Sequence, residues 1–191
     1  MDMNTKLFIF GFILILLGCK ETTYKVELAK ALQNVIGDTI KLPSNFKISK
    51  YNVESSRFDT YSMWSKKNHF KLITYAPDIT CSPCLLSDLR PWYLLIDSIK
   101  QNIEPKTTFD ILFIFETDEY AELSSDIQEQ EFGLPFCIDG SKVYSKNNKF
   151  VKNFPLVTFL VDSSNVVKLL SAPLGSHKSR RILLEYIDDN Y

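Results

Sequence analysis

The stretch that decides the fold is Cys81-Ser82-Pro83-Cys84, which lies between an apolar run at residues 70–75 and a helix-like run at residues 85–100. The hydrophobic pattern changes there from that of a strand to that of a helix. Two cysteines separated by two residues can close a small disulfide ring at such a junction. The first cysteine stands where the N–H groups and dipole of a helix N-terminus stabilise a thiolate. The arrangement therefore favours thiol–disulfide exchange.

The rest of the chain predicts alternating strands and helices. The continuous apolar run at residues 109–115 is typical of a strand buried on both faces, and Pro91 should kink the helix that follows the cysteines. A polar loop with irregular pairing is expected at residues 44–66. Further strands are expected at residues 38–43 (a short edge strand), 69–76, 134–138, 156–161 and 166–170, the last two as a hairpin, and helices at residues 83–103, 119–131 and 176–187, with a turn or helix at 144–153.

The N-terminal sequence predicts an export signal. An apolar run at residues 7–17, broken only by Gly11, is too short to span a bilayer as a helix and fits a signal-peptide core. It ends in Leu16-Leu17-Gly18-Cys19, which resembles the lipobox of bacterial lipoproteins. The resemblance implies a signal peptide at residues 1–18 and a lipid on Cys19. An uncleaved anchor and an ordinary signal peptide are the alternatives.

Residues 19–35 are then expected to form a tether with a short helix, and residues 36–191 the folded domain. No Asp follows Cys19 directly, the residue that retains many such proteins in the inner membrane of enteric bacteria. This favours a cell-envelope protein anchored in the outer membrane and facing the periplasm. Lys20-Glu21 weakly resembles surface-export signals of Bacteroidetes lipoproteins, so exposure on the cell surface stays open.

Composition limits the function further. The chain has 191 residues, a net charge of −1 and 45% hydrophobic residues, which suits one domain with a packed core. The near-neutral charge does not point to nucleic acid as a partner. Beyond Cys19 the cysteines are Cys81, Cys84 and Cys137. In an exported protein the first two can be oxidised, and Cys137 is expected to be a small buried hydrophobe.

Two motifs carry a family resemblance. Cys81-Ser82-Pro83-Cys84 after the first core strand, with Phe154-Pro155 before the penultimate one, resembles the thioredoxin superfamily. The chain is most similar there to exported TlpA-like and AhpC/TSA-like lipoproteins of Bacteroidetes, over roughly residues 36–187. The resemblance implies an α/β, thioredoxin-like fold in which helices flank a central mixed β-sheet, with an N-terminal extension.

The same resemblance assigns roles to residues. It implies that Cys81 is the exposed attacking thiol and Cys84 the buried resolving thiol. It implies that Pro155 is a cis-proline facing the pair, which is the inexpensive place for a cis peptide. Phe154 would then present its backbone to an extended substrate. No cofactor is implied, and the expected partners are envelope proteins with cysteines, or a redox partner.

The chain departs from the family in its acidic residues. Many thioredoxin-like reductases hold a buried acid near the cysteines, whereas the strand at residues 71–75 has none. Asp78 and Asp88 are the nearest carboxylates and the candidates for proton handling. The tryptophan that usually precedes the first cysteine is also missing.

Four functions can be weighed against these features. The favoured one is a membrane-anchored thiol–disulfide oxidoreductase, and the proline in the motif resembles the more reducing members, which favours a reductase. The alternative is a thioredoxin-fold binding lipoprotein with a structural disulfide. Zinc needs about four ligands, the only histidines in the sequence are His69 and His177, and there is no second cysteine pair, so no metal site is expected. A peroxidase of the peroxiredoxin type needs a Thr-x-x-Cys loop, and Thr80-Cys81 has the wrong spacing.

Overall fold

The structure is a computed structural model, and contacts divide the chain into two compact units, Met1–Val35 and Ile36–Tyr191. The expected signal peptide and the lipidation site Cys19 lie outside the described residues. The structure describes residues 35–43, 46–61, 69–77, 79, 81–104, 107–153, 156–171, 173–174 and 176–191.

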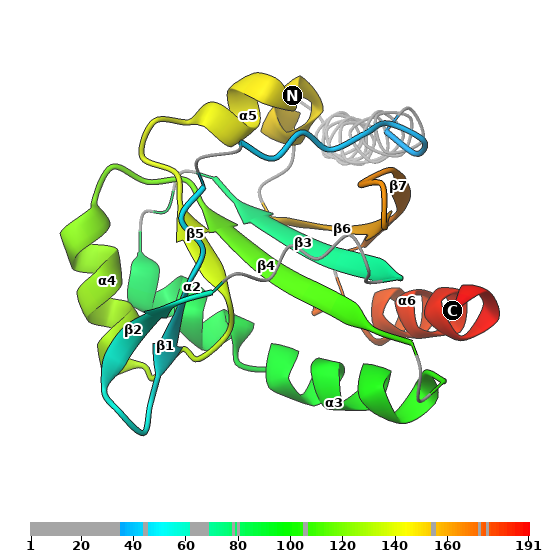
Figure 1. Cartoon of the computed structure of the whole chain (residues 1–191), viewed down its shortest axis with the longest axis horizontal. Coiled ribbons are helices and arrows are strands. Elements are labelled where there is room, and N and C mark those ends of the chain that lie inside the picture. The colour runs from blue at the N-terminus through cyan, green and yellow to red at the C-terminus, as the bar shows by residue number, and fades with distance from the viewer. Residues whose placement is uncertain are drawn as a thin grey trace, which may run out of the picture. The chain divides into compact units, whose positions relative to one another are not determined.

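The described part of the second unit is built on a seven-stranded mixed sheet with the order β2-β1-β5-β4-β3-β6-β7 (Figure 1). Strands β3, β4 and β5 are parallel to one another, and the remaining pairs are antiparallel. The strands are β1 (Ser49–Asn52), β2 (Arg57–Thr60), β3 (Phe70–Ala76), β4 (Phe109–Phe115), β5 (Phe136–Ile138), β6 (Val157–Asp162) and β7 (Val167–Ser171).

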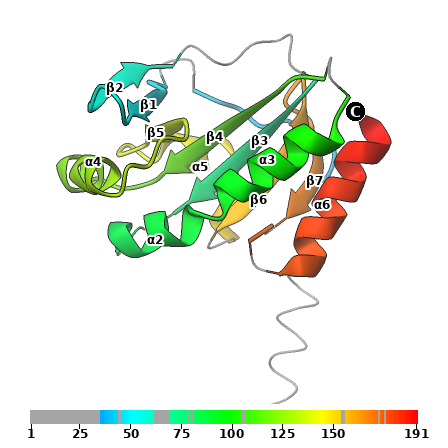
Figure 2. The ribbon, with the colours of Figure 1, turned by 90° about the horizontal axis from the view of Figure 1, so that it is seen from below.

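Helices cover both faces of this sheet. Figure 2 shows α2, α3 and α6 together on one face, and α5 lies on the other. The helices are α2 (Ser82–Leu89), α3 (Trp92–Asn102), α4 (Tyr120–Glu129), α5 (Val143–Asn147) and α6 (His177–Asn190), with a 3-10 turn, η1 (Lys149–Asn153). No helix in the described ranges is long and apolar enough to cross a membrane.

Strand β3 lies at the centre and is buried along its whole length. Its alternate side chains Phe70, Leu72 and Ala76 join the core beneath α2, α3, α4 and α6. Tyr75 points to the other face and packs on Tyr144 of α5, with ring centroids 5.2 Å apart. Burial on both faces explains why this strand and β4 are mostly apolar, apart from Lys71, Thr74 and Asp110, and do not alternate between apolar and polar residues.

The expected kink at Pro91 is a complete break. Helix α2 ends at Leu89, and α3 begins at Trp92 with Pro91 as its N-cap residue. Proline has no N–H to donate and its ring clashes with the preceding turn, so the helix cannot continue through it. As a result α2 is a separate, short helix that begins directly after Cys81.

Two predictions near the N-terminus of the domain are wrong. The expected edge strand at residues 38–43 forms only an isolated bridge between Thr39 and Val166. The backbone of Lys41 bonds instead to the Asn148 side chain, through N–H to Oδ1 at 2.8 Å and Nδ2 to the carbonyl at 2.9 Å. The expected loop at residues 44–66 contains the β1–β2 hairpin, whose strands are too short and too polar to show a clear pattern.

Candidate redox site

Cys81 and Cys84 form a disulfide at the N-terminus of α2, with their Cα atoms 5.4 Å apart. Cys81 is the extended N-cap residue, and its carbonyl accepts the Leu85 N–H at 3.1 Å. Pro83 stands in the first turn, where its missing N–H costs nothing because that group has no intrahelical partner. The chain reaches this turn directly from the carboxyl end of β3, so the site lies at the carboxyl edge of the central parallel strands.

Both cysteines are exposed, and the expectation that Cys84 is buried is wrong. The reason is the helical period of α2. Its buried residues are Ser82, Leu86 and Leu89, which form one stripe towards the core. Cys84 lies two residues from both Ser82 and Leu86 and so falls on the opposite side of the helix. Both sulfur atoms therefore lie on residues that solvent reaches.

Ser82 joins the cysteine turn to α4. The residue is 7% exposed, and its hydroxyl donates a hydrogen bond to Oδ2 of Asp126. Asp126 is half-buried and lies between Leu123 and Ile127, which are the buried residues of α4. Sequence reasoning missed this contact, because nothing in the pattern of α4 distinguishes Asp126 from the other acidic residues of that helix.

A buried acid is present near the carboxyl edge of β3, although not on β3 itself. Glu116 directly follows β4 and is 5% exposed. Its Oε2 accepts the Tyr75 hydroxyl at 2.8 Å, and its Oε1 lies 3.7 Å from Nζ of Lys142. Because β3 and β4 are parallel with Ala76 opposite Phe115, Glu116 lies at the edge where the chain leaves β3 for the cysteines. The only feature of the sequence that could have indicated this buried acid is the position of Glu116, directly after an apolar strand.

The other expected site residues divide into two groups. Asp88 is exposed on α2 one turn beyond Cys84, a spacing that places the two side chains on the same face of the helix. Its role in proton handling stays a prediction. Asp78, Phe154 and Pro155 lie outside the described residues.

Cys137 is separate from the disulfide. It lies on β5, is 2% exposed and is a free cysteine. Burial, and secondarily the nearby Asp139 carboxylate, raises the pKa of the Cys137 thiol far above its ordinary value. A thiol held neutral in this way is a poor nucleophile, so Cys137 behaves as the small buried hydrophobe that the sequence predicted.

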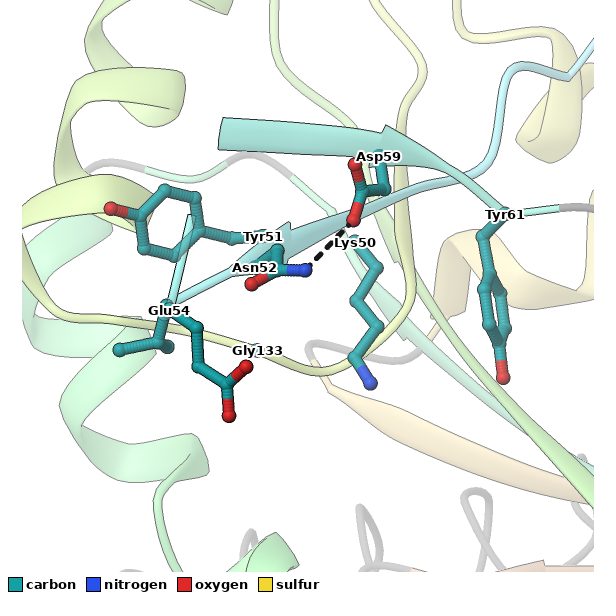
Figure 3. A pocket seen from close by; sticks show the side chains of 8 residues that line it. Lys50, Tyr51, Asn52, Glu54, Asp59, Tyr61 and Gly133 are labelled. Carbon is teal, nitrogen blue, oxygen red and sulfur yellow. Dashed lines mark hydrogen bonds between the residues drawn. The ribbon is translucent and has the colours of Figure 1, made fainter. Parts of the chain in front are cut away.

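An open hollow of about 520 Å³ lies on the β1–β2 hairpin, and neither Cys81 nor Cys84 is among the residues that line it (Figure 3). A hydrogen bond of 3.0 Å from Nδ2 of Asn52 to Oδ2 of Asp59 closes one side of it. Lys50, Glu54 and Tyr61 point into the same space. The cysteine site is thus distinct from this hollow and lies on an exposed helix end.

No protein-family model matches the chain, and no curated protein matches it. Solved structures do. AhpC of Mycobacterium tuberculosis is similar with a TM-score of 0.54 and 17% identity, over 81% of this chain and 96% of that one. The reduced 2-Cys peroxiredoxin of Plasmodium vivax is similar with a TM-score of 0.53 and 15% identity, over 81% and 95%. A bacterioferritin comigratory protein of Xanthomonas campestris, described for alkyl peroxide reduction, is similar with a TM-score of 0.51 and 14% identity, over 80% and 98%.

These similarities define the class of fold. The chain has a thioredoxin-like α/β fold of the kind found in AhpC and the peroxiredoxins, with a mixed sheet between helices. The resemblance read from Cys-x-Pro-Cys is therefore confirmed at the level of the fold. At identities of 14–17% the comparisons speak for the fold alone, so the chemistry is argued from the site.

Proposed function

We propose that this protein is a thiol–disulfide oxidoreductase that acts through Cys81 and Cys84. One observation carries the proposal. The two cysteines form a disulfide at the N-terminus of α2, and both are exposed. A structural disulfide has no need of solvent, whereas exchange requires that a thiolate reach the sulfur in line with the S–S bond.

The chemistry needs no cofactor. In the reducing direction, the Cys81 thiolate attacks one sulfur of a substrate disulfide, forming a mixed disulfide and releasing one substrate thiolate. Cys84, after loss of its proton, then attacks the Cys81 sulfur and releases the second substrate thiolate. The products are the Cys81–Cys84 disulfide and a substrate dithiol, so the two electrons pass from the protein to the substrate. The oxidising direction is the reverse, and the reduction potentials of the partners decide between them.

The α2 N-terminus supports Cys81 as the attacking thiol. Cys81 is the N-cap residue, where the partial positive charge of the helix end favours a thiolate. Cys84 lies in the first turn of the same helix. Because Cys84 is exposed, resolution occurs at a surface, and the substrates best suited to it are proteins whose disulfides protrude. The proline in the motif favours a reductase.

The N-terminal sequence supports a place of action in the cell envelope. Residues 7–19 support cleavage after Gly18 and lipidation of Cys19. The protein would then act from a lipid anchor in the cell envelope, at the outer membrane and facing the periplasm, or on the cell surface. Envelope proteins with cysteines, or an envelope redox partner, are the substrates that this location supplies.

Two other functions remain to be separated by experiment. A thioredoxin-fold binding lipoprotein would keep the disulfide as a structural element and transfer no electrons. A peroxidase is favoured by the fold, since the bacterioferritin comigratory protein of Xanthomonas campestris is described for alkyl peroxide reduction. The spacing Thr80-Cys81 speaks against it. A peroxidase of this type also needs an arginine that helps polarise the peroxide, and Arg90, the arginine nearest to the pair in sequence, lies exposed at the far end of α2.

The test measures the cysteine couple directly. The full-length protein, in detergent, is equilibrated with glutathione buffers of stepped ratio, and free thiols are trapped and counted by mass. A reversible two-electron transition at Cys81 and Cys84, with catalysed reduction of insulin disulfides, supports the proposal. The absence of such a transition would contradict the proposal and would favour the binding lipoprotein. Consumption of hydrogen peroxide that exceeds insulin reduction would identify a peroxidase instead.

A further inference from the structure

Ser82 is buried, whereas the other residues of the disulfide ring formed by residues 81–84 are exposed. Cys81, Pro83 and Cys84 are all exposed, whereas Ser82 is 7% exposed and begins the core-facing stripe of α2. A buried hydroxyl needs a partner, and here the partner is the Asp126 carboxylate on α4. The hydrogen bond thus runs from the middle of the cysteine motif to a different helix.

The first turn of α2 has few other means of support. Cys81 makes no side-chain capping bond, and the first turn contains no acidic residue. Helix ends without a capping side chain are less stable than capped ones. A hydrogen bond to a charged group is stronger than one between neutral groups, so the bond to Asp126 can offset the stability lost with the missing cap.

Asp126 is itself held firmly. Its neighbours Leu123 and Ile127 are buried at 1% and 0% exposure, so α4 presents this carboxylate from a helix fixed in the core. A rigid acceptor restrains its donor. The position of Ser82, and with it the turn that separates the two sulfurs, is therefore set from α4.

We propose that Asp126 is a positioning residue for the cysteine pair, which it holds ready for ring closure through Ser82; this inference rests on the proposed function. Ring closure converts two thiols into one S–S bond and passes two electrons and two protons to an oxidant, here glutathione disulfide, which becomes two glutathione thiols. In the disulfide form the S–S bond itself restrains the turn. In the dithiol form the hydrogen bond from Ser82 to Asp126 restrains the turn instead. Loss of this hydrogen bond would shift the equilibrium from the disulfide towards the open dithiol.

The experiment measures the equilibrium constant for ring closure against glutathione, in the full-length chain. Ser82→Ala and Asp126→Ala remove the bond, and each is expected to lower the constant about three- to tenfold, which equals a rise of about 15–30 mV in reduction potential. The double variant should lose no more than either single variant, because both remove the same interaction. Asp126→Asn keeps an oxygen acceptor and should change the constant less than twofold. Glu122→Ala, an exposed carboxylate one turn earlier on α4, is the matched control and should have no effect.

Each outcome decides the inference. Unchanged constants in Ser82→Ala and Asp126→Ala, or losses that add in the double variant, overturn it. A loss in Asp126→Asn equal to that in Asp126→Ala also overturns it, since charge rather than the bond would then set the equilibrium. Asp126 is half-buried, so Asp126→Ala carries the test if Ser82→Ala fails to fold. A wild-type protein without any reversible couple defeats the proposed function itself, a result that the variants cannot mimic.

Discussion

The hydroxyl of Tyr75, near the end of β3, donates a 2.8 Å hydrogen bond to the carboxylate of Glu116, which directly follows β4. Both residues are buried. The bond joins the two central parallel strands at the edge from which the chain leaves for the cysteine turn. The pair thus gives this edge a buried carboxylate, although β3 carries no acid of its own between Lys71 and Tyr75.

Tyr75→Phe should destabilise the protein, because it leaves the buried Glu116 carboxylate without one of its donors. We expect the free energy of unfolding to fall by about 1–3 kcal/mol, measured by urea denaturation of the oxidised protein. Tyr144→Phe is the matched control. The Tyr144 hydroxyl is buried and has no hydrogen-bond partner among the described residues, so its removal should be neutral or stabilising. Equal losses of unfolding free energy in the two variants would contradict a stabilising role of the hydrogen bond between Tyr75 and Glu116.

Stability should decline in alkali because of Cys137. Burial raises the pKa of its thiol in the folded protein. Below pH of about 8.5 the thiol is protonated in both states and has no effect. Above that pH the unfolded chain loses a proton that the native protein keeps, so the free energy of unfolding falls by about 1.4 kcal/mol per pH unit.

The measurement is urea denaturation of the oxidised protein between pH 7 and pH 10, where Cys81 and Cys84 do not titrate because they form a disulfide. Cys137→Ala should have a lower free energy of unfolding at pH 7, because the smaller side chain leaves a cavity. Above pH 8.5 its free energy of unfolding should decline less steeply than that of the wild type. Parallel declines in the two proteins would show that other groups are responsible. Tyr144, whose pKa burial also raises, adds its own decline only above about pH 10.

Cys84→Ser should trap substrates. Without the second thiol, the mixed disulfide at Cys81 has no internal route to resolution and accumulates in cells. Non-reducing gels, followed by mass spectrometry of the bands lost on reduction, would identify the partners. The double variant Cys81→Ser, Cys84→Ser is the control and should trap none; trapping in it would implicate one of the two remaining cysteines, Cys19 or Cys137.

Cys19→Ala should abolish lipidation. Metabolic labelling with palmitate is expected to mark the wild-type chain and not the variant, and globomycin should block processing of the wild type. Cys137→Ala is a suitable control, since it removes a cysteine outside the signal region. Retained labelling in Cys19→Ala would remove the basis for a lipid anchor.

Much of the fold could be predicted from the sequence where burial is uniform. The strand predicted at residues 109–115 has the bounds of β4, and the hairpin expected from residues 156–170 is β6 and β7. Runs that are apolar on both faces leave little choice of conformation. At Pro91 the missing N–H predicted only a kink within one helix, whereas the structure has two separate helices, α2 and α3.

The candidate site was harder to predict, because its properties depend on contacts between elements. Sequence spacing placed Cys81 and Cys84 at a helix start but not the side of α2 that faces the core, which is set by Ser82, Leu86 and Leu89. Likewise, Asp126 and Glu116 act on segments 44 and 41 residues away in the chain. No local pattern encodes such pairings.

The backbone of residues 37–41 has a mechanical consequence. The Gly37 N–H donates to the Val167 carbonyl, and the Val167 N–H donates to the Asp38 carbonyl. The backbone of Lys41 forms two hydrogen bonds with the Asn148 side chain. A pulling force on the N-terminal side of the domain would therefore load several bonds at once, in β7 and at the end of α5. Helix α2 is not in that path. The domain could therefore bear tension applied at residues 37–41 while the cysteine pair keeps its geometry.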